Sequence, residues 1–207
     1  MREELVKSFN KLVHYIWVGT NEVPAHFMFN YEKTKQLNPG YKFQIWTEED
    51  IIPLLGEFEE TFHNSSLFHK LQFGRYLVLN HYGGVCCDFD IEWKENFDYV
   101  YSLFEEKDLV FTKRNSLYFY NRGKKTTLLD DYVMIGKPGL TKSFLEFCFN
   151  RTERKQDETE PISVYALTEW CLGKDNIGFF THDQIYDNPD CSIAYHENKK
   201  TWRLTNI

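Results

Sequence analysis

No stretch of this 207-residue sequence approaches the roughly 20 consecutive apolar residues that a helix needs to cross a bilayer. The opening residues, MREELVKSFNKLV, also lack the apolar core of a secretory signal peptide. The sequence contains neither internal repeats nor low-complexity segments. We therefore expect a cytoplasmic protein without a transmembrane segment, and a single domain that spans residues 1–207.

Positive charge is in deficit. The chain has 24 Lys and Arg residues against 31 Asp and Glu, a formal net charge of −7, and its pI is about 5.5. Proteins that grip the phosphates of duplex nucleic acids carry a basic surface, which this composition does not provide. We expect no nucleic-acid partner.

The number of cysteines is odd, five, and Cys86 and Cys87 are adjacent. Side chains of neighbouring strand residues point to opposite faces of a sheet, so these two are poorly placed to pair with each other. The pattern predicts reduced thiols in a cytosolic protein rather than a disulfide framework.

Strands and helices alternate along the chain. Residues 12–18 are β-branched and aromatic and end at Gly19, which is typical of a buried strand followed by a turn. Residues 67–82 show helical spacing and end at Gly83. Further strands are predicted at 41–46, 85–91, 109–113, 132–135 and 193–196, and further helices after Thr47, at 141–150 and at 161–171. This order predicts an α/β fold with a mostly parallel central sheet flanked by helices.

Two carboxylates, Asp88 and Asp90, stand one residue apart at the end of the apolar segment that begins at Gly83-Gly84. On a strand they would share a face and could address one point. Carboxylate oxygens suit hard divalent cations, and open α/β folds bind ligands at the C-terminal edge of the sheet. The alternative is a pair of loop acids that cap a helix or a turn.

Four segments in chain order resemble the family-32 glycosyltransferases, sugar transferases built around a DXD motif. The resemblance covers the chain from about Leu12 to Trp202 and extends more distantly to the glucosylating toxins of clostridia. The segments are His14-Tyr15-Ile16-Trp17-Val18-Gly19, then Asn38-Pro39-Gly40-Tyr41 with Ile45-Trp46-Thr47, then Arg75-Tyr76 through Tyr82-Gly83-Gly84 to Asp88-Phe89-Asp90, and finally His196 with Trp202.

The resemblance implies a GT-A (Rossmann-like) fold, a nucleotide-diphosphate sugar as donor, Mn²⁺ or Mg²⁺ as cofactor, and retention at the anomeric carbon. Asp90 would bind the metal ion directly. Asp88 would reach the ribose, the sugar or the metal ion, and His196 would complete the metal shell. Arg75 would hold the sugar or a phosphate oxygen, and Asp131 would face the donor sugar or the acceptor.

The resemblance also implies a nucleobase site in which Trp17 stacks on the base. Ile16 and Gly19 would lie beside that ring, Phe89 would contribute to the donor site, and Trp202 would close over the diphosphate.

The chain departs from the family pattern at three places. Leu71 and Gln72 replace a Ser-Asp pair that usually precedes the arginine, and Gln72 can still hydrogen-bond a sugar or ribose hydroxyl but carries no charge. Asp131 replaces an Asn, and Glu160-Pro161 replaces a Gly-Pro. The first departure puts donor preference, or even activity, in question.

Structural roles remain open for three of the candidates. Trp17 could belong to the core, Arg75 could pair with a structural acid, and His196 could be a surface or core histidine.

The leading hypothesis is a metal-dependent, retaining hexosyltransferase that uses a UDP-sugar rather than a GDP-sugar. Its acceptor would be a glycan, a lipid-linked sugar or a protein, as in bacterial or viral polysaccharide biosynthesis. The alternative is a degenerate, non-catalytic module that binds nucleotide sugar or carbohydrate, for which 13 Tyr, 18 Phe and 5 Trp offer stacking surface. A phosphatase of the haloacid-dehalogenase kind is disfavoured, because Glu92 stands where that class expects Thr or Val.

Overall fold

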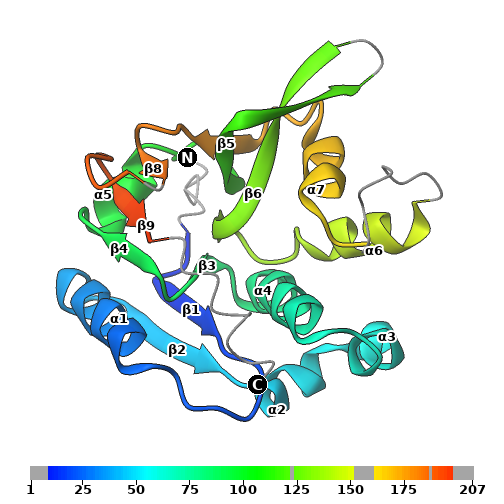
Figure 1. Cartoon of the computed structure of the whole chain (residues 1–207), viewed down its shortest axis with the longest axis horizontal. Coiled ribbons are helices and arrows are strands. Elements are labelled where there is room, and N and C mark those ends of the chain that lie inside the picture. Colours follow the sequence, from blue (N-terminus) through cyan, green and yellow to red (C-terminus); the bar gives the residue numbers. More distant parts are fainter. Residues whose placement is uncertain (1–8, 122–123, 152–160, 187, 198–207) are drawn as a thin grey trace, which may run out of the picture.

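The computed structural model describes residues 9–121, 124–151, 161–186 and 188–197 (Figure 1). A six-stranded sheet with the order β2-β1-β3-β6-β5-β7 forms its centre. Five of these strands run in the same direction, and β6 alone is antiparallel to its neighbours β3 and β5. The prediction of a mostly parallel sheet is therefore confirmed. The strands are β1 (Leu12–Ile16), β2 (Lys42–Trp46), β3 (Gly84–Cys87), β5 (Leu109–Asn121), β6 (Lys124–Gly136) and β7 (Ile177–Phe180).

A second, three-stranded sheet joins distant parts of the chain. Its central strand β9 (Ala194–His196) pairs antiparallel with β4 (Ile91–Trp93) and parallel with β8 (Ile185–Tyr186). Ile91 and His196 are register partners. The strand near the end of the chain is thus fixed directly beside residues 88–90.

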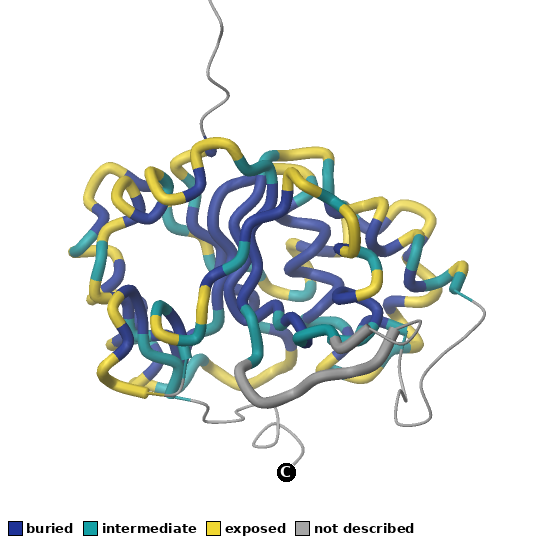
Figure 2. Tube along the Cα trace, turned by 90° about the horizontal axis from the view of Figure 1, so that it is seen from above, coloured by how far each residue is buried: buried dark blue, intermediate teal, exposed yellow. Residues whose placement is uncertain are grey.

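Helices cover both faces of the central sheet (Figure 1). One core cluster joins the sheet to α4, α6 and α7, and the other joins it to α1, α5 and the smaller sheet. Seen from above, the buried strands fill the middle of the molecule and exposed segments surround them (Figure 2). The helices are α1 (Ala25–Leu37), α2 (Glu48–Ile51), α3 (Glu59–His63), α4 (Leu67–Tyr82), α5 (Phe97–Ser102), α6 (Lys142–Asn150) and α7 (Val164–Cys171), with 3₁₀ turns η1 (Ile52–Leu54) and η2 (Gly56–Phe58).

Cys86 and Cys87 lie in opposite core clusters, as their adjacency on a strand predicts. All five cysteines belong to the described residues, and all are buried thiols outside any disulfide bond. None of the helices in the described part of the chain has the length and apolar character needed to cross a lipid bilayer.

The connection from α4 to β3 is tight because two glycines follow each other. Gly83 ends α4 with φ 61°, and Gly84 opens β3 with φ 98°. A Cβ atom on Gly84 would lie 2.4 Å from the carbonyl oxygen of Leu12 on β1. Only glycine therefore allows β3 to begin so close to β1, and this approach fixes where β3 ends.

The sequence predicted a single strand over residues 85–91, and this prediction is wrong. Strand β3 stops at Cys87, and Asp88-Phe89-Asp90 forms a turn in which the Ile91 amide donates to the Asp88 carbonyl at 3.3 Å. Asp88 and Asp90 consequently do not share a strand face. They converge because the turn folds between β3 and β4.

His14 is a buried titratable group on β1 whose two ring nitrogens both have partners. Its Nε2 lies 2.8 Å from the Gly83 carbonyl oxygen, and its Nδ1 accepts from the Trp46 indole at 3.1 Å. This arrangement fixes a neutral ring that is protonated on Nε2. Burial lowers the pKa of His14 from 6.5 to about 4, although the bond to Gly83 opposes the shift.

We expect the free energy of unfolding to fall as the pH falls from about 6.5 to about 4. In that range the unfolded chain binds a proton at His14 that the folded chain excludes, at a cost of up to about 3 kcal/mol. His14→Gln replaces the ring with an amide that can both donate and accept but does not titrate. Urea unfolding of both proteins at several pH values tests this, and an equal pH dependence would rule out His14 as its source.

Candidate functional site

A cavity of about 300 Å³ opens beside the C-terminal ends of β1 and β3 and the first half of α4. It holds most of the residues that the sequence singled out, together with several that it did not. The lining residues are Ile16, Trp17, Val18, Leu67, Phe68, Leu71, Gln72, Arg75, Asp88, Phe89, Asp90, Arg114, Asp130, Asp131, Tyr132, Val164 and His196.

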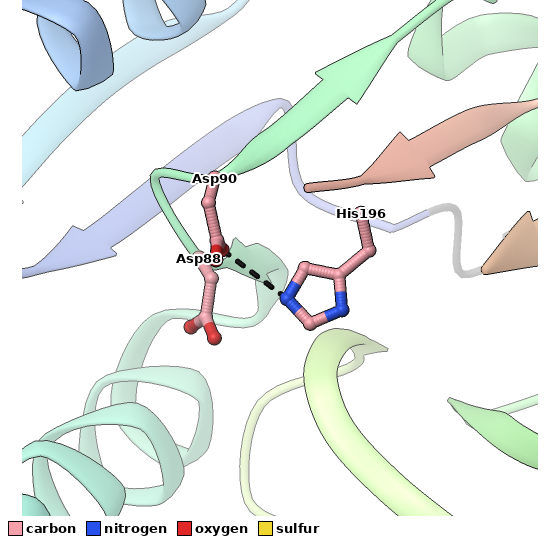
Figure 3. Close-up of side chains that lie close together, drawn as sticks. All are labelled: Asp88, Asp90 and His196. Carbon is pink, nitrogen blue, oxygen red and sulfur yellow. Dashed lines mark ion pairs between the residues drawn. The ribbon is translucent and has the colours of Figure 1, made fainter. Parts of the chain in front are cut away.

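Three potential metal ligands meet in this cavity. One ligand atom from each of Asp88, Asp90 and His196 lies within 4.8 Å of the others. Figure 3 shows both carboxylates reaching from the turn after β3 and the imidazole arriving from β9. The His196 Nε2 is 3.3 Å from the Asp90 Oδ1. Two carboxylates and one imidazole are a donor set that fits Mn²⁺ or Mg²⁺.

Neighbouring contacts hold this group in position. The His196 ring stacks on Tyr132, with ring centroids 4.4 Å apart and an interplanar angle of 23°. The Glu197 amide donates to the Asp90 carbonyl at 2.9 Å, which ties the end of β9 to the turn. The side chains of Asp90 and His196 are only 8% and 15% exposed, so their orientation is set by packing rather than by solvent.

Arg75 links two acids in the cavity wall. Its guanidinium forms an ion pair with Asp88 and lies 3.4 Å from the Asp131 Oδ1. The Tyr76 hydroxyl donates to the other Asp131 oxygen at 3.0 Å. Burial raises the pKa of the Asp131 carboxyl, and the Arg75 guanidinium opposes that rise. Arg75 thus offsets the charge of two poorly solvated carboxylates.

Gln72 presents a buried polar atom to the same cavity. The residue is 5% exposed, and no described residue donates a hydrogen bond to its Oε1. An unpaired buried acceptor is costly unless a ligand or water satisfies it. The amide that replaces the family's aspartate is therefore placed to accept a hydrogen bond from a ligand hydroxyl.

Aromatic side chains form the end of the cavity that follows β1. Trp17 is half-buried, its indole donates to the Asn21 carbonyl at 2.6 Å, and its ring meets the Phe89 ring edge-on at 5.8 Å. Ile16 lines the cavity beside Trp17. Gly19 is not a lining residue. With φ 102° it turns the chain away near Leu67.

Sequence reasoning missed Arg114, Asp130 and Tyr132, which line the cavity from β5 and β6. The sequence offered an indication of Asp130 and Tyr132, because they flank the predicted Asp131 and Tyr132 begins the predicted strand 132–135. The sequence offered no indication of Arg114, because the position of this residue in the cavity depends on how β5 and β6 pair. Trp202 lies outside the described residues, so its predicted role stays a prediction.

Residues 24–109 match the family model described as a glycosyltransferase sugar-binding region containing a DXD motif. The match covers 86 of the chain's 207 residues, and over these residues the chain is similar to that family. The glycosyltransferase region contains β2, α4 and the Asp88-Phe89-Asp90 turn. The resemblance drawn from the sequence is thereby confirmed.

Two curated relatives and one solved structure add to this comparison. A mannosyl phosphorylinositol ceramide synthase of Saccharomyces cerevisiae is 33% identical over 85 residues, 39% of this chain and 22% of that protein. Inositol phosphoceramide mannosyltransferase 1 of Schizosaccharomyces pombe is 30% identical over 96 residues, 42% of this chain and 30% of that protein. Each match thus spans less than a third of the relative.

The solved structure is the PaToxG glycosyltransferase, with a TM-score of 0.52 at 16% identity. The match covers 79% of this chain and 69% of that one. At this identity the likeness concerns the fold alone, and it agrees with the predicted GT-A architecture.

Proposed function

We propose that this chain is a single-domain, metal-dependent glycosyltransferase that moves a sugar from a nucleotide diphosphate to an acceptor hydroxyl. The observation that carries the proposal is the convergence of Asp88, Asp90 and His196 in the cavity of a DXD glycosyltransferase region. The unpaired Gln72 acceptor in the same cavity supports a hydroxyl-bearing ligand.

The order of the strands gives the donor a direction. Trp17 follows β1, Asp88 and Asp90 follow β3, and Asp131 lies on β6, the next strand of the sheet. A donor with its base against Trp17 and its diphosphate at the metal ligands would place its sugar over β6. Gln72 and Arg75 on α4 would then face the sugar and the phosphates.

The chemistry follows from charge. A divalent ion held by Asp88, Asp90 and His196 would stabilise the negative charge that develops on the departing diphosphate. Arg75 keeps Asp88 and Asp131 oriented and supplies a further cation beside the phosphates. With retention, the C1–O bond to the diphosphate breaks, the acceptor oxygen bonds to C1 on the same face, and its proton passes to a diphosphate oxygen.

The identity of the sugar is proposed from the relatives. Both curated names contain a mannosyl group, which favours mannose as the transferred sugar. Uridine is the commonest base across folds of this kind, which favours UDP over GDP as the carrier, so the test must include both nucleotides. The acceptor is proposed to be a glycan, a lipid-linked sugar or a protein.

We expect donor binding to require a divalent ion. Titration calorimetry is carried out with UDP-glucose, UDP-galactose and GDP-mannose, in Mn²⁺ or Mg²⁺ and again in EDTA. We expect one of these three donors to bind when the metal ion is present and not to bind in EDTA. Nucleotide release into water would then report slow hydrolysis of that donor. Affinity that is unchanged by EDTA would contradict the metal-bridged site. Metal-dependent binding without any turnover would favour the non-catalytic module.

We expect Trp17→Ala to weaken binding of the nucleotide diphosphate alone by about 1–3 kcal/mol, the range for aromatic stacking on a base. Tyr99→Ala, which removes an exposed ring on α5 outside the cavity, serves as the control. Calorimetry and thermal unfolding should be measured together. Lost stability with intact affinity would assign Trp17 to the core.

A further inference from the structure

Arg114 and Asp130 form an ion pair in the cavity wall, outside the residues that match the family model. The bond runs from the Arg114 Nε to an Asp130 carboxylate oxygen, and the other Asp130 oxygen accepts from the Asp131 amide at 3.0 Å. No described residue accepts a hydrogen bond from the two terminal nitrogens of Arg114. Its side chain is 35% exposed. The pair therefore offers an oriented set of donors to whatever enters the cavity.

Two opposed irregularities in the β5–β6 pairing present this ion pair to the cavity. Val110 pairs with Ile135 and Thr112 with Asp130, so residues 131–134 of β6 lie opposite one residue of β5. Further along, Lys113 pairs with Leu129 and Tyr118 with Thr127, so residues 114–117 of β5 lie opposite one residue of β6. Asp130 adjoins the first bulge and Arg114 begins the second. Bulges of this kind re-aim side chains and are frequent beside active sites.

The position of the pair along the sheet separates it from the donor. Strands β1, β3, β6 and β5 are consecutive neighbours, so Arg114 stands three strand spacings, roughly 14 Å, from the end of β1 that carries Trp17. In the donor orientation proposed above, the base, the diphosphate and the sugar occupy β1, β3 and β6. The next strand, β5, is where an acceptor would approach the sugar.

The charge of the cavity favours an uncharged acceptor group there. The described lining residues include four carboxylates and two guanidinium groups. One divalent ion would cancel the excess of negative charge, and the diphosphate of a bound donor would restore it. An additional anion would enter against that charge, whereas the hydroxyls of a polyol can accept from Arg114 without this cost.

We propose that Arg114 binds vicinal hydroxyls of a neutral polyol ring as the acceptor, and that Asp130 is the positioning residue that orients Arg114. This inference rests on the proposed function, because the donor has to define the sugar position.

The test compares transfer with hydrolysis in the full chain. Donor hydrolysis is followed with the nucleotide sugar that binds, then repeated with increasing myo-inositol or methyl α-mannoside as probe acceptors. In the wild type, a bound polyol either yields a glycosylated product or suppresses hydrolysis by displacing water. We expect Arg114→Gln and Asp130→Asn to raise the half-effective polyol concentration at least tenfold, with a donor KM within about twofold of the wild type. Arg114→Lys should recover part of the effect.

The control is Lys113→Gln. This substitution removes a cation from the position of β5 next to Arg114. The Lys113 amine lies over the Phe179 ring, 5.3 Å from the ring centroid, and Lys113 is not among the residues that line the cavity. A donor KM that rises in step with the polyol effect would place Arg114 at the donor and overturn the inference. So would a wild type that hydrolyses donor but ignores both polyols, or one for which inositol 1-phosphate acts at a tenth of the inositol concentration. Absence of donor binding in the wild type would instead overturn the proposed function itself.

Discussion

Asp90→Asn is expected to lower metal-dependent donor hydrolysis by about 10²–10³-fold, the loss seen when one group that stabilises developing charge is removed. Asn keeps the size of the side chain but loses the negative charge that faces the His196 imidazole at 3.3 Å. The Mn²⁺ concentration needed for half-maximal hydrolysis should rise as well, because a negatively charged ligand is lost. Nucleotide release measured across a Mn²⁺ titration tests both expectations.

Asp175→Asn is the matched control, since Asp175 is exposed and lies outside the cavity. Thermal unfolding of Asp90→Asn without metal should not show a large loss, because the substitution removes a poorly solvated charge. A variant that hydrolyses donor normally at low Mn²⁺ would show that Asp90 is not a metal ligand. The site would then have to rely on Asp88 and His196.

Arg75→Met is expected to destabilise the fold by about 3–5 kcal/mol, the usual cost of removing one partner from a buried ion pair. The Arg75 side chain is 8% exposed and contacts both Asp88 and Asp131. Met fills much of the volume but leaves two carboxylates near each other without a cation. The free energy of unfolding in urea, measured at pH 7, tests this prediction.

A second substitution separates charge from packing. In Arg75→Met with Asp131→Asn, one of the stranded carboxylates is neutral, so part of the lost stability should return. Asp131→Asn alone should be the mildest of the three. If the double variant were as unstable as Arg75→Met, the loss would come from packing around α4. The ion pairs would then contribute little.

Local signals in the sequence were sufficient for several elements. The helix predicted after Thr47 is present as α2, where Thr47 and Asp50 form a reciprocal cap, and Pro53 follows directly in a 3₁₀ turn, so α2 is short. Helix α4 spans the predicted residues 67–82 and ends at the predicted Gly83, and the Ser66 side chain caps its start. In each case the side chain and the backbone that it serves are neighbours in the chain.

The sequence pattern did not predict helix α1, and the reason is physical. Its buried face consists of Phe27, Asn30, Tyr31 and Thr34, so two of its four core positions are polar. Asn30 donates to the Phe89 carbonyl at 3.3 Å, and the Thr34 hydroxyl bonds to the Asn30 carbonyl at 2.8 Å. These bonds satisfy the buried polar groups, but only the tertiary structure reveals them. Because half of the buried positions are polar, apolar residues do not recur at helical spacing, and the pattern of hydrophobic residues could not indicate this helix.

The sequence likewise indicated only some of the residues of the candidate site. Asp88, Asp90 and Arg75 could be found because they lie within short motifs, and His196 because the resemblance supplied it. Arg114 could not be found, since its place in the cavity depends on a shift of register between β5 and β6. Pairing irregularities depend on the packing of whole strands and leave no mark in a single sequence.

The pairing of β9 with β4 also bears on the order in which a growing chain acquires its properties. A ribosome releases Asp88 and Asp90 long before His196, which reaches them only after β9 has docked beside Ile91. A fragment that ends before β9 would carry the acidic turn but no imidazole to share the ion. Tight metal binding would then distinguish chains translated through His196 from prematurely terminated ones, and a partial product would lack the complete ligand set even if its central sheet had formed.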